Sequence, residues 1–121
     1  MIIAYPYLAE LEEDNRFFVH FIDIEEAFTQ ADSLEEAAFN ASEVLTGVLA
    51  CRLEDNDEIP EPSICPENGF MASPSPKIQA ALLLRKAMGN KRLENPDHWT
   101  SLKQLDKAAK ALGKRLILTL E

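Results

Sequence analysis

An alanine-rich segment that begins near Ser33 limits the possible folds of this chain more than any other feature. Ser33 and Glu36 have the spacing of a capping box, in which the serine caps a helix and the glutamate reaches back. Asp32 and Glu35 have the same spacing one residue earlier. Apolar residues then recur at helical spacing, with small alanines that allow close approach to a sheet: Leu34, Ala37, Ala38, Ala41, Leu45, Val48 and Leu49. We therefore predict one long helix packed on a sheet.

Phe39 lies off this apolar stripe. One interpretation is contact with another chain or with the C-terminal segment of the same chain. The other, which is the more frequent situation, is an aromatic residue partly covered by its own domain. Both interpretations follow from the sequence.

The residues before the helix have the composition of strands. Residues 2–11 are rich in strand formers, and Pro6 confines this stretch to a sheet edge or a strand end. Residues 16–24 carry apolar side chains on both faces, which predicts a central strand. The polar turn between the two segments predicts an antiparallel hairpin with Asn15 at a positive φ. Residues 27–31 are predicted to form a third short strand.

Prolines mark the end of this first unit. The acidic stretch 54–58 ends the helix, and Ile59-Pro60-Glu61-Pro62-Ser63 predicts an extended, stiff exit. Residues 64–76 contain loop-forming prolines and a glycine, and a short strand fits residues 69–72. We place a domain boundary between residues 69 and 70.

The remaining residues predict a small helical element that ends in a strand. A second helix fits Lys77–Met88, with Ser75 as its cap and Pro76 in its first turn. A third helix fits Leu102–Leu112, and residues 116–120 read as a strand.

Charge divides the chain in the same way. Residues 1–69 contain 17 Asp and Glu against 2 Lys and Arg, whereas residues 70–121 contain 4 against 10. The net charges are therefore -15 and +6, in agreement with the total of -9. Such asymmetry indicates two surfaces with different partners. The acidic part favours a basic partner, and the basic part favours nucleic acid or the acidic part of the chain.

Cysteine and histidine usage indicates no metal site. Cys51 and Cys65 are far apart and are expected to be free thiols, with a disulfide as the less favoured alternative. His20 and His98 lack zinc-ligand spacing and are expected to be packing or surface residues. No segment has the apolar length of a membrane span and the start lacks a basic n-region, so we expect a cytoplasmic protein.

Local sequences in this order resemble the HicB antitoxin family. The resemblance covers about half of the chain, and the segments that carry it are Phe21-Ile22-Asp23, Thr29-Gln30-Ala31-Asp32, Leu34-Glu35-Glu36-Ala37, Asn40-Ala41 and Ile59-Pro60-Glu61-Pro62-Ser63. The chain departs from the family pattern at Ile22, where the family has proline, at Glu25-Glu26, where it often has Pro-Gly, and at Ala31, where it has glycine.

The resemblance implies an α+β fold. A partial ribonuclease-H-like antiparallel sheet with one long helix is expected, followed by the small helical C-terminal element ending in a strand. Residues 1–69 would form the HicB-like antitoxin domain. Residues 70–121 would form a C-terminal dimerisation and possible DNA-binding element. A ribbon-helix-helix traced through residues 64–112 is the less favoured structural alternative.

The resemblance also implies that the chain binds and neutralises a HicA-type toxin, a small basic mRNA-cleaving ribonuclease. The alternative is an orphan HicB-like transcriptional regulator without a toxin. On the first interpretation, the toxin-binding residues are expected among Asp23, Glu25, Glu26, Asp32 and Glu36. The competing interpretation is that these carboxylates only keep the domain soluble.

The basic C-terminal residues have two interpretations as well. They are expected either to contact operator DNA or to form a solvated helix face: Lys86, Lys91, Arg92, Lys103, Lys107 and Lys110. The segment between Met88 and Ser101 is too short for the two short helices of a complete helix-turn-helix, so the DNA-binding module is shortened. A homodimer or higher oligomer is expected, with Leu116, Leu118 and Leu120 pairing across a two-fold axis.

We do not expect an enzyme. Asp23, Asp32 and Glu36 are the candidate metal-binding carboxylates near the predicted strand ends, as a two-metal nuclease would need. Asp32 and Glu36 are accounted for as helix-capping residues, and Asp23 suits a turn. No catalytic residue, metal or cofactor is therefore predicted.

Overall fold

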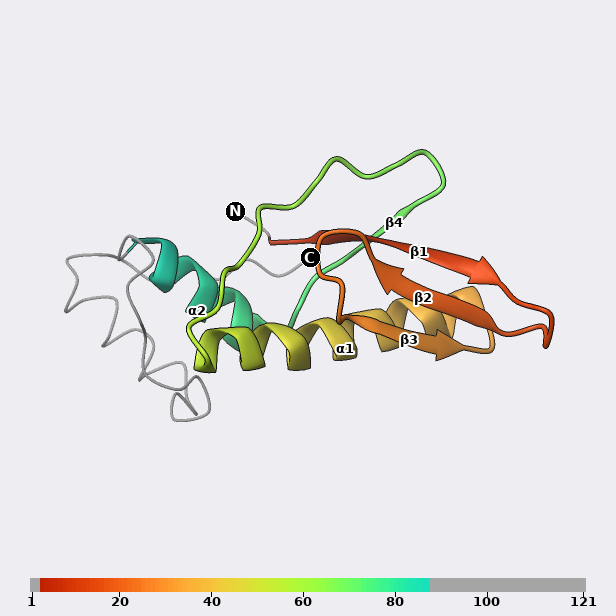
Figure 1. Cartoon of the computed structure of the whole chain (residues 1–121), viewed down its shortest axis with the longest axis horizontal. Helices are drawn as coiled ribbons and strands as arrows, with labels where there is room; N and C mark the ends of the chain where they lie inside the picture. Colours follow the sequence, from red (N-terminus) through yellow and green to blue (C-terminus); the bar gives the residue numbers. More distant parts are fainter. Residues whose placement is uncertain (1–2, 88–121) are drawn as a thin grey trace.

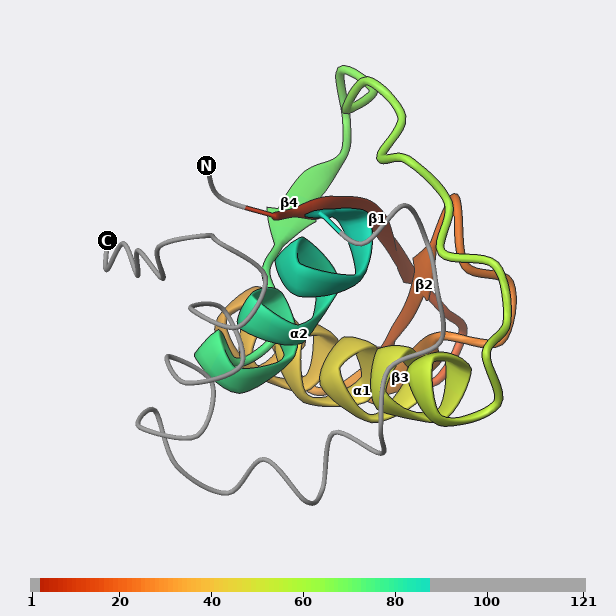
Figure 2. The same ribbon diagram turned by 90° about the vertical axis from the view of Figure 1, so that its left-hand side faces the viewer.

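The computed structural model describes residues 3–87, which form a four-stranded antiparallel sheet covered on one side by two helices (Figures 1 and 2). The sheet order is β3-β2-β1-β4. The elements along the chain are β1 (Tyr5–Leu11), β2 (Phe17–Phe21), β3 (Phe28–Ala31), α1 (Leu34–Glu54), β4 (Phe70–Ala72) and α2 (Pro76–Ala87). The predicted third helix and final strand lie outside the described residues, as does Met88 of the predicted second helix.

The predicted hairpin is confirmed. β1 and β2 pair antiparallel, and Asn15 has a φ of 63° in the turn between them. The backbone N–H of Glu12 donates to the carbonyl oxygen of Arg16 at 2.8 Å and closes this turn. Pro6 is the second residue of β1, so the missing N–H falls near a strand end as predicted. β2 pairs with strands on both sides, which confirms its central position.

The core lies between the sheet and α1. Ser33 is the N-cap of α1 and its hydroxyl accepts a hydrogen bond from the Glu36 N–H at 3.1 Å. The buried stripe of α1 recurs every four residues, at Ala37, Ala41, Leu45, Leu49 and Leu53. It packs against inward-facing strand residues that include Tyr7, Val19 and Phe21. Burial of these apolar side chains is the main stabilising contribution to the fold.

Two details of the predicted helix are wrong. Leu34 and Ala38 were assigned to the buried stripe, but both are exposed. The fully buried residues follow each other at intervals of four, and the flanking Val44, Val48 and Ala50 are half-buried against the core, whereas Leu34 and Ala38 in the first turns face solvent. The carboxylate of Glu36 was expected to reach back to Ser33. Instead it accepts a hydrogen bond from Asn40 Nδ2 at 3.4 Å, one turn further along α1.

The segments after α1 close the fold on the opposite edge. Asn56, with a φ of 55°, follows the end of α1, and the chain then runs through the proline-rich loop to β4, which pairs with β1. α2 packs beside α1 and contributes Ile78, Ala81 and Leu82 to the core. Figure 2 shows both helices on the same side of the sheet. The predicted division of the chain between residues 69 and 70 remains a prediction, because most of the second part lies outside the described residues.

Candidate protein-binding surface

The sheet face opposite α1 carries an aromatic surface that is partly open to solvent. The pairing register places His20 between Leu8 of β1 and Phe28 of β3, and Phe18 between Glu10 and Gln30. The Phe18 ring stacks on the His20 ring with centroids 5.1 Å apart and lies 6.1 Å from the Phe28 ring. Phe28 is 55% exposed. We call the residues Leu8, Phe18, His20 and Phe28 the outer aromatic surface.

Carboxylates border this surface. Glu10 lies on the same sheet face, where its Oε1 atom is 3.5 Å from Nε2 of His20. The exposed residues Glu12, Glu13 and Asp14 form the tip of the adjoining hairpin. An apolar centre with a charged rim is the usual arrangement of a protein-binding surface. A basic partner is favoured here because like charge would repel an acidic one.

The five acidic residues predicted from sequence lie in different local environments. Asp32 Oδ1 accepts a hydrogen bond from Arg16 Nε at 2.8 Å, and Arg16 also donates to Gln30 Oε1 at 3.2 Å. This pair ties the start of β2 to the end of β3. Glu36 is exposed on the first turn of α1 and contacts Asn40. The structure therefore brings Asp32 and Glu36 to the same end of the sheet.

Asp23, Glu25 and Glu26 follow β2 at the other end of the sheet. Asp23 accepts two hydrogen bonds from Ser63, one from its backbone N–H at 2.8 Å and one from its hydroxyl. Glu26 binds Arg52 through two hydrogen bonds of 2.7 Å each. Glu25 is exposed and makes no hydrogen bond or ion pair with another described residue. Asp23 and Glu26 therefore hold the loop and α1 in place, whereas the Glu25 carboxylate faces solvent.

The carboxylates do not converge on a metal site in the part of the chain that the structure describes. Residues 3–87 contain no group of three or more His, Cys, Asp or Glu side chains that could hold a metal ion. Asp23 and Asp32, two of the candidate metal ligands, are occupied by Ser63 and Arg16. Both cysteines are free thiols, with Cys51 exposed on α1 and Cys65 half-buried in the loop.

A second exposed aromatic residue lies on α1. Phe39 is 64% exposed, so the described residues of its own domain do not cover it. Beside it, Thr29 of β3 and Asn40, Glu43 and Val44 of α1 line a shallow depression. Asn40 Nδ2 donates to the carbonyl oxygen of Gln30 at 2.9 Å and fixes α1 against β3 here.

Sequence reasoning did not single out the outer aromatic surface. The signal was present, because residues 16–24 carry apolar side chains on both faces, but it was interpreted only as evidence for a central strand. Of the predicted basic residues, Lys86 lies on α2 with its Nζ atom 3.8 Å from Glu61. The others lie outside the described residues, as do Leu116, Leu118 and Leu120. No helix within residues 3–87 is long and apolar enough to cross a membrane.

Comparison with known proteins identifies the class of this acidic α+β domain with an aromatic sheet face as an antitoxin. Residues 4–73 match the family described as HicB-like antitoxin of bacterial toxin-antitoxin systems. The chain belongs to this family, which confirms the resemblance inferred from the sequence. HicB antitoxins are not enzymes.

Relatives extend over almost the whole chain. Antitoxin HicB 1 of Photorhabdus laumondii is 31% identical over 140 positions, covering 98% of this chain and 88% of the relative. Antitoxin HicB of Escherichia coli K12 is 30% identical over 137 positions, covering 98% and 99%. Because this chain has 121 residues, both relatives contain residues within the aligned region that it lacks. The N-terminal domain of Burkholderia pseudomallei antitoxin HicB superimposes with a TM-score of 0.46 and 14% identity, covering 60% of this chain and 96% of that domain.

Proposed function

We propose that this antitoxin neutralises a HicA-type toxin, a small basic mRNA-cleaving ribonuclease, by binding it through the outer aromatic surface. The observation that carries the proposal is the cluster of exposed Phe28 with half-buried Phe18 and His20 on the outer sheet face, with carboxylates at its border. Membership in an antitoxin family supports it. The charge of -15 on residues 1–69 supports the choice of a basic partner.

The two parts of this surface would contribute differently to binding. Buried aromatic side chains near the centre of an interface usually carry most of the binding free energy. Carboxylates at the rim accelerate the encounter with a basic protein, and high salt weakens this effect. We therefore assign affinity mainly to Phe18 and Phe28, and association rate mainly to the acidic residues.

The acidic residues proposed to bind the toxin remain Asp23, Glu25, Glu26, Asp32 and Glu36. Glu25 is the one whose carboxylate has no partner among the described residues, so it loses the least when it binds a toxin lysine or arginine. Glu25→Gln should slow association at low salt with little effect on folding. Glu26→Gln weakens the hydrogen-bonded ion pair with Arg52 as well. In this comparison variant, toxin association and the free energy of unfolding should therefore both decrease.

Two phenylalanines of similar exposure provide a matched test. The full chain and a HicA-type toxin are co-expressed, their association is measured with purified proteins, and rescue of growth is scored. Phe28→Ala should weaken association by about tenfold or more, as expected for an aromatic residue central to an interface. Phe39→Ala on α1 should leave association within about threefold, as a residue outside the interface would.

The outcomes distinguish the surfaces. Failure of the wild-type proteins to associate even at low salt would contradict the antitoxin function with this class of toxin. A loss caused by Phe39→Ala but not by Phe28→Ala would move the interface to α1. Circular dichroism of both variants provides the folding control, since each side chain is more than half exposed.

We further propose a cytoplasmic, dimeric protein whose shortened C-terminal region represses its own operon. The net charge of +6 on residues 70–121 supports contact with DNA phosphates. The same feature favours the second candidate, an orphan regulator without a toxin. Binding of operator DNA that persists in Lys103→Ala/Lys107→Ala/Lys110→Ala would remove these lysines from the proposal. An unchanged mass in solution after Leu116→Asp/Leu118→Asp would remove the dimer.

The sheet and α1 are interpreted as a partial ribonuclease-H-like framework that no longer carries out catalysis. Asp23 and Asp32 are engaged in hydrogen bonds to Ser63 and Arg16, which supports this interpretation. The chain alone should cleave neither RNA nor DNA when Mg²⁺ or Mn²⁺ is added. Cleavage that disappears in Asp23→Asn or Asp32→Asn would contradict it.

A further inference from the structure

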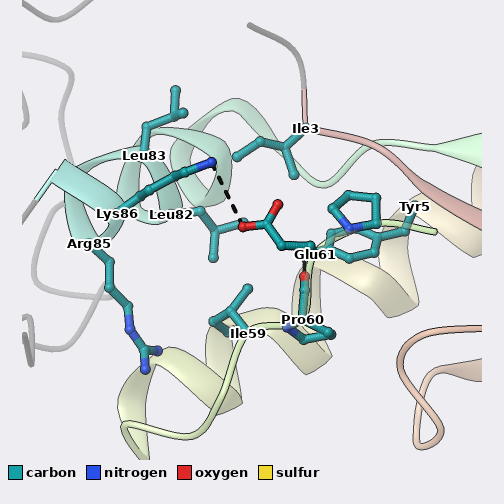
Figure 3. Close-up of a pocket in the computed structure, with 10 residues that line it drawn as sticks. Ile3, Tyr5, Ile59, Pro60, Glu61, Leu82, Leu83, Arg85 and Lys86 are labelled. Carbon is teal, nitrogen blue, oxygen red and sulfur yellow. Dashed lines mark hydrogen bonds and ion pairs between the residues drawn. The ribbon is translucent and has the colours of Figure 1, made fainter. Parts of the chain in front are cut away.

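A cavity lies between α2, the start of β1 and the proline-rich loop, away from the outer aromatic surface. Its volume is about 210 Å³, which suits a small molecule. Its walls are largely apolar and include Ile3, Ile59 and Leu82, and three charged residues also line it: Glu61, Arg85 and Lys86 (Figure 3). The Tyr5 hydroxyl does not face the cavity as a free donor, because it donates to the carbonyl oxygen of Pro60 at 2.6 Å.

Arg85 is the unexplained residue of this cavity. It is only 7% exposed, and its Nε and Nη1 atoms are buried without a hydrogen-bond partner among the described residues. Figure 3 shows its side chain extending from α2 past Ile59 toward the ribbon at the end of α1. The C-terminal end of a helix attracts a cation but supplies no hydrogen bond in this geometry. A buried guanidinium without hydrogen-bond partners costs free energy. A bound ligand with a hydrogen-bond acceptor would therefore be stabilised at this position.

The other two charges limit what that acceptor can be. Lys86 Nζ lies 3.8 Å from Glu61 Oε1, and this exposed ion pair borders the cavity. Glu61 would repel a second negative charge beside the first, which disfavours a phosphate dianion. A carboxylate satisfies a guanidinium through two parallel hydrogen bonds while bringing a single negative charge.

We propose that this cavity binds a small monocarboxylate whose apolar body lies against Ile59, Leu82 and Ile3 and whose carboxylate pairs with Arg85. Such a ligand bridges α2 and the proline-rich loop, which are joined here by the exposed Lys86–Glu61 pair. Occupation of the cavity therefore stabilises the position of α2 on the sheet. The proposal does not depend on toxin binding, since it concerns a different face of the molecule.

The test uses the full-length antitoxin and benzoate as the probe, with benzamide as the neutral control of the same shape. Amide resonances are followed by NMR during titration. Benzoate should shift the signals of Ile59, Leu82 and Arg85 in a saturable way, and benzamide should bind about tenfold more weakly or not at all, as loss of a charged hydrogen-bonded pair requires. Inorganic phosphate should also bind more weakly than benzoate.

Two substitutions assign the effect. Arg85→Met keeps the apolar stem and should weaken benzoate binding by about tenfold or more, whereas Lys86→Met should change it by less than about threefold. Equal affinities of benzoate and benzamide, an unchanged affinity in Arg85→Met, or no saturable shift with wild-type protein would each overturn the proposal. If Arg85→Met does not fold, the comparison of benzoate, benzamide and phosphate on the wild-type chain still decides it. Competition between toxin and benzoate at these same resonances would also contradict the proposal, because the cavity lies on a different face from the proposed toxin-binding surface.

Discussion

Arg52 Nε and Nη2 each donate a 2.7 Å hydrogen bond to a separate carboxylate oxygen of Glu26. The two residues are 26 positions apart, and their pairing fixes the last turn of α1 against the loop that follows β2. Arg52 Nη1 also donates to the carbonyl oxygen of Glu58 at 2.9 Å. One guanidinium therefore joins the helix end to two loops.

This pair predicts acid sensitivity. The hydrogen bonds that Arg52 donates to Glu26 are the main reason why the pKa of Glu26 is lowered from 4.5 to about 2. A lowered pKa means that the stabilisation is fully present above pH 4.5 and is lost as the pH falls toward 2. Because the Glu26 side chain is half exposed, we expect Glu26→Gln to cost only about 1 kcal/mol at neutral pH. Urea unfolding of both proteins should show this difference shrinking at about pH 3. A difference that does not depend on pH would exclude the ion pair as its source.

The two tyrosines of this chain should titrate abnormally. Burial raises the pKa of Tyr5 to about 12 and also raises the pKa of Tyr7 above 10. A raised pKa of a neutral acid gives stabilisation that is present below pH 10 and is lost as the pH rises through 12. The ultraviolet absorbance of tyrosinate should therefore increase at a higher pH than for free tyrosine in the folded protein, with the Tyr5 step near pH 12. A step at pH 10 with the amplitude of two tyrosines would mean that neither residue is buried as described, and a step of half that amplitude would mean this for one of them.

The Tyr5 hydroxyl should contribute to stability through its bond to Pro60. Tyr5→Phe removes the donor and leaves the Pro60 carbonyl oxygen without it, at an expected cost of about 1 kcal/mol. Tyr7→Phe is the matched control, because the Tyr7 hydroxyl makes no hydrogen bond with the described residues. Equal costs for the two substitutions, measured by urea unfolding, would argue against a specific role of the Tyr5–Pro60 bond.

Gly47 is a position at which the protein can be stabilised. It lies within α1, and apart from its chain neighbours and the backbone of its own helix, a Cβ atom added there would meet no heavy atom within 4 Å. Gly47→Ala should raise the free energy of unfolding by about 0.5 to 1 kcal/mol, because alanine loses less backbone entropy in a helix. Gly69→Ala should lower it, since the added Cβ would lie 2.8 Å from Cγ of Pro66. Thermal unfolding should show a higher midpoint temperature for Gly47→Ala and a lower one for Gly69→Ala than for the wild-type protein.

The narrow buried stripe of α1 is testable with two leucines. Leu49 is fully buried, and Leu49→Ala should lower the free energy of unfolding by about 2 to 5 kcal/mol. Leu34 is nearly half exposed at the first turn, and Leu34→Ala should cost about 0.5 kcal/mol or less. The free energies of unfolding of the two variants are compared by denaturant unfolding, and unchanged m-values show that the differences reflect stability alone. A large effect at Leu34 would restore the broader stripe expected from the sequence.

The sequence alone determined the features that depend on neighbouring residues. Ser33 caps α1, Asn15 takes a positive φ, Pro6 lies near a strand end and Phe17–Phe21 form a central strand, because short-range sterics and hydrogen bonds decide these conformations. Local sequence segments in a fixed order were also enough to identify the family.

Only the tertiary structure decided which side chains meet across long intervals. Asp23 contacts Ser63 at a separation of 40 residues, and Glu26 meets Arg52, although both carboxylates read as free surface charge in the sequence. Helical spacing likewise left Leu34 and Leu49 equivalent, and the position of the sheet made one exposed and the other buried. Periodicity fixes the direction of a side chain relative to its own helix, but the packing of distant segments fixes what that side chain touches.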